Sequence, residues 1–248
     1  MSYETISVAK ADGVAIVTMD RPEKLNAMNR TFFAELPAVM NELSADPQVS
    51  AAVLTGAGRA FSAGGDIAMF PALMDDISAV RPHLKAVFDA FHSIEKASVI
   101  VIGAVNGIAH GGGTEITLAC DFAIASPAAS FAFREASLGL IPGFGLTRGP
   151  DVIGLPWTTR LATTAEVIDA DTAAAIGLVM EVVQADQLLE RATAMARAVA
   201  ANSSTATDTA KRFLRRNTDD GLAMAVESTA LGYFTDEAEA AVQAFLDR

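Results

Sequence analysis

The order of the apolar segments constrains the fold of this chain more than any other feature. Short strand-like runs alternate with amphipathic helical stretches up to about residue 135, and helical sequence dominates after about residue 155. Strands that alternate with helices are typical of a sheet covered by helices, so this order predicts an α/β core followed by a helical subdomain. The expected strands lie at residues 6–8, 14–19, 50–54, 99–102, 121–125 and 130–133, with one more near residues 178–183.

Turn and cap residues support several of these elements. Asp12-Gly13 lies between two β-rich runs and is typical of a hairpin turn. Asn29 precedes apolar residues at helical spacing, which predicts a helix that begins there. A long amphipathic helix is expected over residues 76–96, and the glycines at 111–113 lead into another helix.

Composition and charge exclude several classes of protein. Hydrophobic residues make up 51% of the 248 residues, which is enough for a sizeable core and excludes a disordered chain. Acidic residues outnumber basic ones by 30 to 18 and no basic block is present, so we expect no nucleic-acid partner. No apolar run reaches the roughly 18 residues that span a bilayer, and no charged-then-apolar leader is visible. Together with a single cysteine, Cys120, these features predict a cytoplasmic protein without a membrane partner.

Several common catalytic motifs are absent from the sequence. There is no Gly-x-Ser-x-Gly nucleophile turn and no phosphate-binding loop that ends in Gly-Lys-Ser/Thr. The three histidines, His83, His92 and His110, form no close metal-ligand pair, and a lone histidine is more often packed or solvated than a ligand. We therefore expect no metal site.

Two glycine-rich segments, residues 60–67 and 106–115, are the first candidates for a functional site. Glycine lets the backbone approach a ligand closely, and the N–H groups at the start of a helix have no partner within that helix. Two such turns that converge on one point would form an oxyanion hole with two donors. Each segment taken alone is equally consistent with an ordinary tight turn.

Two glutamates in apolar sequence lie beside these segments. Glu115 follows Gly112 by three residues, so the two share one face of a helix. Glu135 follows the strand-like run that ends at about residue 133. Burial among apolar neighbours raises the pKa of a carboxyl group, which suits general acid and base catalysis next to a carbonyl. The alternative is a structural role, as a cap or in an ion pair with Arg134 or Arg148.

A series of motifs along the chain resembles one enzyme superfamily. The motifs are Asn26-Ala27-Met28, Phe61 to Ile67, Ala104 to Gly107, Gly111 to Glu115, Cys120-Asp121, Gly139 to Gly143, and Glu166 to Val179. In this order they are similar to those of the enoyl-CoA hydratase/isomerase (crotonase) superfamily, and the resemblance covers nearly the whole chain.

The resemblance implies both an architecture and an assembly. The expected fold is a spiral of repeated ββα units, here residues 1–190, followed by a C-terminal helical oligomerisation region, here residues 191–248. The expected assembly is a homotrimer, or a hexamer formed as a dimer of trimers. Residues 222–246 have apolar side chains on more than one helical face, which agrees with such an assembly.

The resemblance also implies a function. Members of the superfamily bind acyl-CoA thioesters, and the matching oxyanion-hole donors here are the N–H groups of Gly65 and Gly112. The matching catalytic residues are Glu115 and Glu135, and retention of both favours an enoyl-CoA hydratase. Such an enzyme adds water to a trans-2-enoyl-CoA and gives a 3-hydroxyacyl-CoA, so coenzyme A is part of the substrate and no separate cofactor is implied. The matching substrate-binding positions are Lys24, Ala27, Ala63, Gly64, Asp66, Ile67, Gly111, Pro142 and Gly143.

Two other functions stay open from the sequence. An enoyl-CoA delta isomerase would use the same scaffold, with one glutamate that moves a proton between carbons. A non-catalytic acyl-CoA-binding protein would keep the fold without the chemistry. An ion pair between Arg134 and Glu135 would favour this last alternative.

The chain departs from the family pattern near the expected site. His110 stands where a small or apolar residue is usual, Arg134 where proline is common, and Leu146 where glycine is usual. Leu146 belongs to a segment that borders the acyl pocket in the family, so the resemblance does not define the acyl preference. The basic residues nearest to the coenzyme by motif position are Arg21, Lys24 and Arg59.

Overall fold

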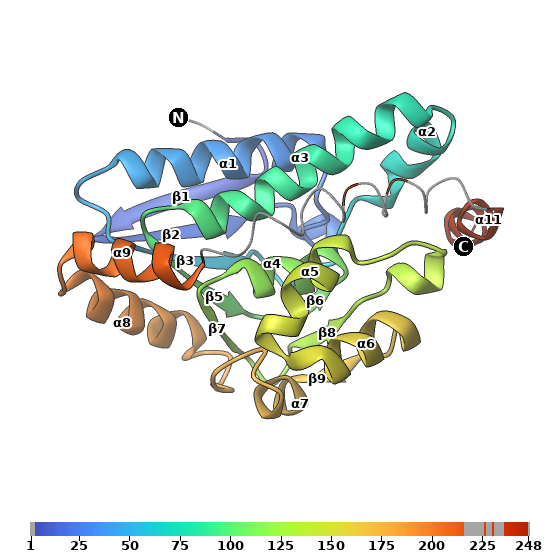
Figure 1. The fold of residues 1–248 in the computed structure, drawn as a ribbon. Coiled ribbons are helices and arrows are strands. Elements are labelled where there is room, and N and C mark those ends of the chain that lie inside the picture. The colour runs from blue at the N-terminus through green and yellow to red at the C-terminus, as the bar shows by residue number, and fades with distance from the viewer. Residues whose placement is uncertain (1–2, 216–225, 227–229, 231–235, 248) are drawn as a thin grey trace.

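The computed structural model describes residues 3–215, 226, 230 and 236–247, and it has an α/β architecture with two sheets and C-terminal helices (Figure 1). The larger sheet has the strand order β1-β2-β3-β5-β7. β1 is antiparallel to β2, and all the other neighbours are parallel. Its strands are β1 (Ile6–Ala11), β2 (Val14–Met19), β3 (Ala51–Gly56), β5 (Ile100–Val105) and β7 (Phe122–Ala125).

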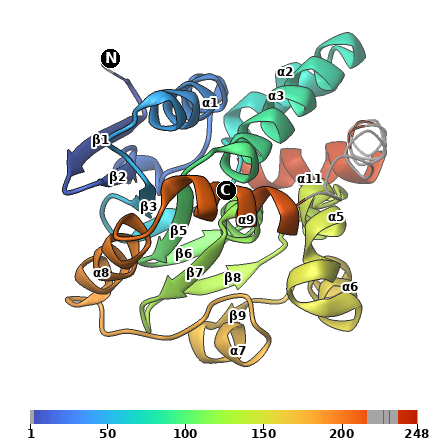
Figure 2. The ribbon, with the colours of Figure 1, turned by 60° about the vertical axis from the view of Figure 1, so that its left-hand side comes forward.

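The larger sheet is buried on both faces. On β3, Leu54 belongs to the core beneath α1 (Arg30–Ala45) and α3 (Ile77–Lys96). Its neighbour Val53 points the other way and packs with α8 (Leu188–Ala200). Figures 1 and 2 show α1 and α3 on one side of this sheet and α8 on the other. Burial on both faces explains why the central parallel strands have continuous apolar sequence rather than an alternating pattern.

The smaller sheet consists of very short strands in the order β4-β6-β8-β9. β4 (Ala60–Ser62), β6 (Ile108–His110) and β8 (Ser130–Ala132) are parallel, whereas β9 (Ile168–Asp169) is antiparallel to β8. Each of the three parallel strands follows a strand of the larger sheet and precedes a helical segment. The chain therefore repeats a ββα unit three times, at β3-β4, β5-β6 and β7-β8, which confirms the expected spiral.

The predicted turn and cap residues have the expected conformations. Asp12 and Gly13 form the β1–β2 turn with φ values of +52° and +79°. The Asn29 side chain accepts a hydrogen bond from the backbone N–H of Phe32 and caps α1. Asp76 caps α3 in the same way, so the long helix begins where the sequence predicts.

Helices follow the smaller sheet, as predicted, but one predicted strand is wrong. At 178–183 the described residues form only a single bridge, between Val182 and Ala125, and the strand in this part of the chain is β9. The backbone is bent at residues 178–180, so its hydrogen bonds to β7 do not extend into a ladder. The helical elements after β8 are η3 (Glu135–Leu138), α5 (Gly143–Val152), α6 (Gly154–Thr164), α7 (Ala170–Ala175), α8, α9 (Ser204–Leu214) and α11 (Asp236–Leu246).

Of the apolar residues expected in the C-terminal helices, Val242 is buried. Four others lie outside the described residues: Leu222, Met224, Leu231 and Phe234. Among the described residues, no helix combines the length and the apolar character that crossing a membrane requires.

Candidate active site

Three parallel strands of the smaller sheet bring distant segments of the sequence to one edge. The turn at residues 63–65 follows β4, the turn at 111–112 follows β6, and Glu135 lies shortly after β8. β6 lies between β4 and β8 and pairs in parallel with both. Because the carboxyl ends of parallel strands lie at the same edge of a sheet, the two glycine turns and this glutamate converge there.

The backbone at Gly65 directs its N–H group away from the neighbouring chain. Met28 donates a hydrogen bond to the carbonyl of Gly64 at 2.8 Å and accepts one from the N–H of Asp66 at 2.9 Å. These two bonds form a parallel bridge through the neighbours of Gly65, so the N–H of Gly65 itself points to the other side. Within the described residues that N–H has no backbone acceptor, and Gly65 lines a cavity.

Gly112 supplies a second N–H group at the same cavity. It is the first residue of α4 (Gly112–Ala119), so its N–H has no partner within the helix. The two turns are in close contact, because a Cβ atom at Gly64 would lie 2.8 Å from the carbonyl oxygen of His110 and 3.3 Å from the nitrogen of Gly112. Gly64 also has a φ of +98°, which L side chains rarely adopt. Only glycine at this position lets the two turns approach.

Helix α4 carries Glu115 on the same face as Gly112. Glu115 is 6% exposed, and its Oε1 accepts a hydrogen bond from the N–H of Gly145 at 2.8 Å, in the first turn of α5. Burial raises the pKa of Glu115 to about 7, against the opposing effect of the hydrogen bonds from the N–H groups of Gly145 and Phe144. The carboxyl group is therefore partly ionised at neutral pH.

Glu135 begins η3 and occupies space that glycine leaves open. A Cβ atom at Gly111 would lie 2.8 Å from Oε1 of Glu135. Oε2 of Glu135 is buried and has no hydrogen-bond partner among the described residues. Burial, and then repulsion by the Glu115 carboxylate, raise the pKa of Glu135 to about 8. Between about pH 7 and about pH 8, the main state of the pair is therefore the singly protonated one, with one carboxyl group ionised and the other neutral.

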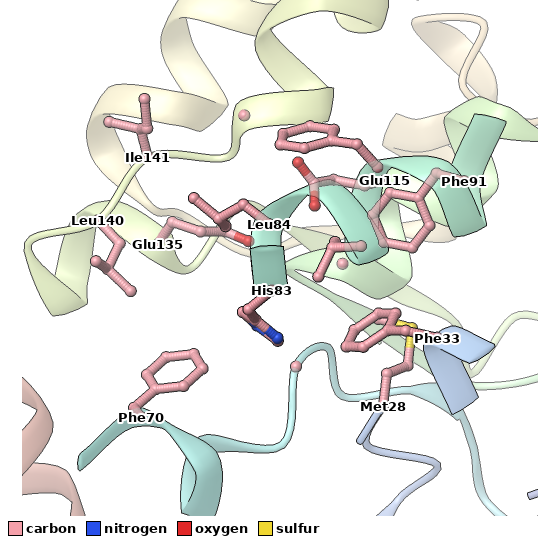
Figure 3. Close-up of a pocket in the computed structure, with 15 residues that line it drawn as sticks. Met28, Phe33, Phe70, His83, Leu84, Phe91, Glu115, Glu135, Leu140 and Ile141 are labelled. Carbon is pink, nitrogen blue, oxygen red and sulfur yellow. The ribbon is translucent and has the colours of Figure 1, made fainter. Parts of the chain in front are cut away.

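A cavity of about 90 Å³ connects both glycines and both glutamates. This space is several times the roughly 10–15 Å³ that one water molecule needs. Figure 3 shows Glu115 and Glu135 directed into the cavity from different elements. Most of the remaining wall is apolar: Met28, Phe33, Phe70, Leu84, Val87, Phe88, Phe91, Leu140, Ile141 and Gly143. The arrangement suits an apolar group that carries one polarised oxygen.

A buried group of charges holds α5, the helix that supplies the donor to Glu115. Nε of Arg148 lies 3.3 Å from Oε1 of Glu95 on α3, and Arg215 donates to the same oxygen at 2.6 Å. Arg148 also donates to Asp151 at 3.1 Å. These contacts connect α5 to α3 and to the residue that follows α9.

The ion-pair alternative for the two glutamates is wrong. Arg148 pairs with Glu95 and Asp151 instead. Arg134 donates to the carbonyl oxygen of Ala165 at 2.9 Å, and within the described part of the chain it forms no ion pair with Glu135. Both carboxyl groups are therefore available to a bound molecule.

Several predicted binding positions belong to the turns around the cavity. Ala63, Gly64, Asp66 and Ile67 are in the same turn as Gly65, Gly111 is beside Gly112, and Pro142 is the N-cap residue of α5 ahead of Gly143. The basic candidates lie outside the cavity wall, where Lys24 and Arg59 are exposed. Arg21 forms an ion pair with Asp66 at 3.1 Å and donates to the carbonyl of Ala27, so it links these two predicted positions.

The departures from the family pattern lie away from the cavity wall. Nε2 of His110 is 3.1 Å from the hydroxyl of Ser130, so this pair connects β6 with β8. Leu146 is 40% exposed. Neither residue lines the cavity.

Two features of the site were not predicted from the sequence. One is the N–H of Gly145, which holds Glu115, and the other is His83, which lines the cavity. His83 lies on the apolar face of α3, on the same side as Val80 and Leu84. This position in an amphipathic helix is the sequence signal that could have indicated that His83 faces the interior.

The chain matches known proteins over almost its whole length. The family model described as enoyl-CoA hydratase/isomerase matches residues 9–248. The chain belongs to the enoyl-CoA hydratase/isomerase family. It is 36% identical to a short-chain-enoyl-CoA hydratase of Clostridium acetobutylicum and 35% identical to a crotonyl-CoA hydratase of Syntrophomonas wolfei. Both alignments cover 100% of this chain and 97% of the relative.

Solved structures agree with this family. The crystal structure of an enoyl-CoA hydratase/isomerase from Xanthobacter autotrophicus Py2 is similar with a TM-score of 0.92 and 29% sequence identity. The match covers 99% of this chain and 94% of that one. The enoyl-CoA hydratase/isomerase fold that the motifs implied is therefore confirmed.

Proposed function

We propose that the protein is an enoyl-CoA hydratase, which adds water to a trans-2-enoyl-CoA and gives a 3-hydroxyacyl-CoA. One observation carries this proposal: two buried carboxyl groups, those of Glu115 and Glu135, face the same cavity as the N–H groups of Gly65 and Gly112. Hydration needs a general base that takes a proton from water and a general acid that gives a proton to Cα. This pair can provide both. The hydratase names of the two relatives above also support it.

A singly protonated pair supplies one base and one acid, and we assign the base to Glu115 and the acid to Glu135. Ionised Glu115 accepts a proton from water while the water oxygen forms a bond to Cβ of the enoyl group. The electrons of the double bond move toward the thioester oxygen. Glu135 then donates its proton to Cα as the thioester carbonyl re-forms. Glu115 ends protonated and Glu135 ionised, and proton exchange restores the starting state.

The two glycine N–H groups stabilise the charge that develops during this step. Negative charge forms on the thioester oxygen when water attacks, and two fixed donors favour that state over the neutral substrate. Both N–H groups belong to a rigid backbone, because Gly64 and Gly112 are in close contact. The donors therefore need little rearrangement when charge develops.

The direct test is turnover of crotonyl-CoA, followed by the loss of the ultraviolet absorbance of the conjugated thioester. The expected product is 3-hydroxybutanoyl-CoA, identified by mass as the substrate plus one water. An isomerase would give a product of unchanged mass from a trans-3-enoyl-CoA and little hydration. A non-catalytic acyl-CoA-binding protein would bind the thioester without either reaction.

The pH dependence of hydration follows from the two raised pKa values. Activity needs Glu115 ionised and Glu135 protonated, so kcat/KM is expected to rise as the pH passes about 7 and to fall as it passes about 8. The measurement is kcat/KM for crotonyl-CoA in buffers of constant ionic strength. A profile that stays flat from pH 6 to pH 9 would contradict the assigned roles.

We also propose that the chain assembles as a homotrimer or hexamer, with residues 191–248 as the oligomerisation region. At the end of α9, Phe213 and Leu214 are 65% and 81% exposed in the single chain. Large apolar side chains in such positions are commonly covered by another subunit. Light scattering is expected to give three or six times the chain mass of 25.8 kDa. A stable monomer at micromolar concentration would exclude this assembly.

A further inference from the structure

His83 is a polar residue in an otherwise apolar part of the cavity wall. It lies on α3, and its ring contacts Phe33 edge to face, with the ring centroids 5.8 Å apart. Figure 3 shows the imidazole pointing into the cavity between Phe33 and Phe70. No described residue forms a hydrogen bond with either ring nitrogen. The side chain is half-buried and lines the cavity, so its ring nitrogens are open to a bound molecule.

The imidazole is neutral at physiological pH. Burial, and then the positive charge of Arg30, lower the pKa of His83 to about 4. A neutral imidazole carries one N–H donor and one acceptor nitrogen. It can therefore donate a hydrogen bond to an oxygen at the far end of an acyl chain.

Arg30 lies on the other side of the same wall. A second hollow, of about 340 Å³, is lined by Arg30, Phe33, Ala79, Pro82, His83 and Ala86. Phe33 and His83 line both hollows, so the active-site cavity and the space beside Arg30 meet at these two side chains. Arg30 forms no ion pair with any described residue, although acidic residues outnumber basic ones by 30 to 18 in the chain. His83 belongs to both hollows and the exposed Arg30 lines the outer one, so a neutral donor and a cation lie near each other beside the cavity.

We propose that His83 and Arg30 recognise a carboxylate at the far end of the acyl chain, so that the preferred substrates are enoyl-CoA thioesters of dicarboxylic acids. The proposal rests on the proposed hydratase function for the reaction, but recognition of the carboxylate does not require it. The acyl chain would pass Phe33, the N–H of His83 would donate to the carboxylate, and the Arg30 guanidinium would pair with it. Charged hydrogen bonds of this kind are stronger than neutral ones.

The test uses saturated thioesters, which bind without undergoing hydration. Affinities are measured by calorimetry for glutaryl-CoA against pentanoyl-CoA and for adipyl-CoA against hexanoyl-CoA, so that each pair has the same chain length. The wild type is expected to bind the acidic member of at least one pair about ten-fold more tightly. Arg30→Gln and His83→Phe are each expected to remove that preference, and Arg30→Gln is expected to leave binding of the uncharged member within about two-fold. The phenylalanine keeps an aromatic ring against Phe33.

Lys85→Gln is the matched control. Lys85 lies on the same helix as His83, forms an ion pair with Asp89, and lines neither hollow. Its removal changes the net charge as Arg30→Gln does, and the preference should remain. The proposal is wrong if the wild type prefers neither acidic thioester, or if the preference survives in Arg30→Gln or His83→Phe. Hydration of crotonyl-CoA is measured separately, so a failure of the proposed function is distinguished from a failure of carboxylate recognition.

Discussion

Replacing Glu135 with glutamine is expected to lower kcat for crotonyl-CoA hydration by about 10²–10⁴-fold. The side chain keeps its size and its place beside Gly111, but it loses the proton that Cα would receive. Glu115→Gln is expected to have an effect of similar size, because the base for water is then absent. Stopped-flow or steady-state absorbance measures both. Near-wild-type turnover in either variant would remove that residue from the mechanism.

Glu190→Gln provides a matched control for this chemical change. Glu190 is exposed on α8, which covers the face of the large sheet opposite α1 and α3. Its replacement should leave kcat and the melting temperature unchanged. A loss of activity in this control would indicate that the assay responds to net charge rather than to the site.

The stability of the Glu135 variant should depend on pH with a defined sign. The folded chain raises the pKa of Glu135 from an ordinary 4.5 to about 8, so it binds that proton more tightly than the unfolded chain. The free energy of unfolding therefore falls as the pH rises from about 4.5 to about 8. Glutamine has no such proton, so the melting temperature of the variant should rise relative to the wild type between pH 4 and pH 9. This result would also show that the inactive variant is folded.

Local sequence signals were enough to predict the larger sheet and its first helices. The strands of this sheet are buried apolar runs. Asn29 caps α1 through a short-range hydrogen bond, and Asp12-Gly13 forms the β1–β2 turn with positive φ values. β4 and β6 are three residues long and were not predicted, whereas β8, which is equally short, was predicted from the run at residues 130–133. β4 pairs with β6 and β6 pairs with β8, so these strands depend on pairing between distant segments, which is a tertiary effect.

The residues of the candidate site that could be predicted from the sequence are those whose role depends on their residue type. Glycines before a helix and glutamates in apolar sequence are visible in the sequence, and the structure brings Gly65, Gly112, Glu115 and Glu135 together. The donor at Gly145 was not visible, since it depends on how α5 packs. A Cβ atom at Gly145 would lie 2.6 Å from the ring of Phe133. That close packing places the N–H of Gly145 against Glu115.

The second large effect is expected at the oxyanion hole. Replacing Gly112 with proline removes one of the two N–H donors, because proline has no N–H. Gly112 is the first residue of α4, a position that tolerates proline since its N–H makes no bond within the helix. Loss of one such donor typically reduces kcat by about 10²–10³-fold. The assay is again hydration of crotonyl-CoA.

Gly112→Ala separates the lost donor from the added bulk. Alanine keeps the N–H but adds a Cβ atom 2.5 Å from Cε of Met28, the flexible end of a side chain that can move. If the N–H group stabilises the transition state, the alanine variant should retain much more activity than the proline variant, and circular dichroism should show both folded. Equal losses would mean that crowding against Met28, not the donor, controls the rate. In a complex with an acyl-CoA, the thioester oxygen should lie about 2.7–3.2 Å from the nitrogens of both Gly65 and Gly112. An oxygen that faces a side-chain donor instead would leave Glu115 and Glu135 without a polarised double bond to act on.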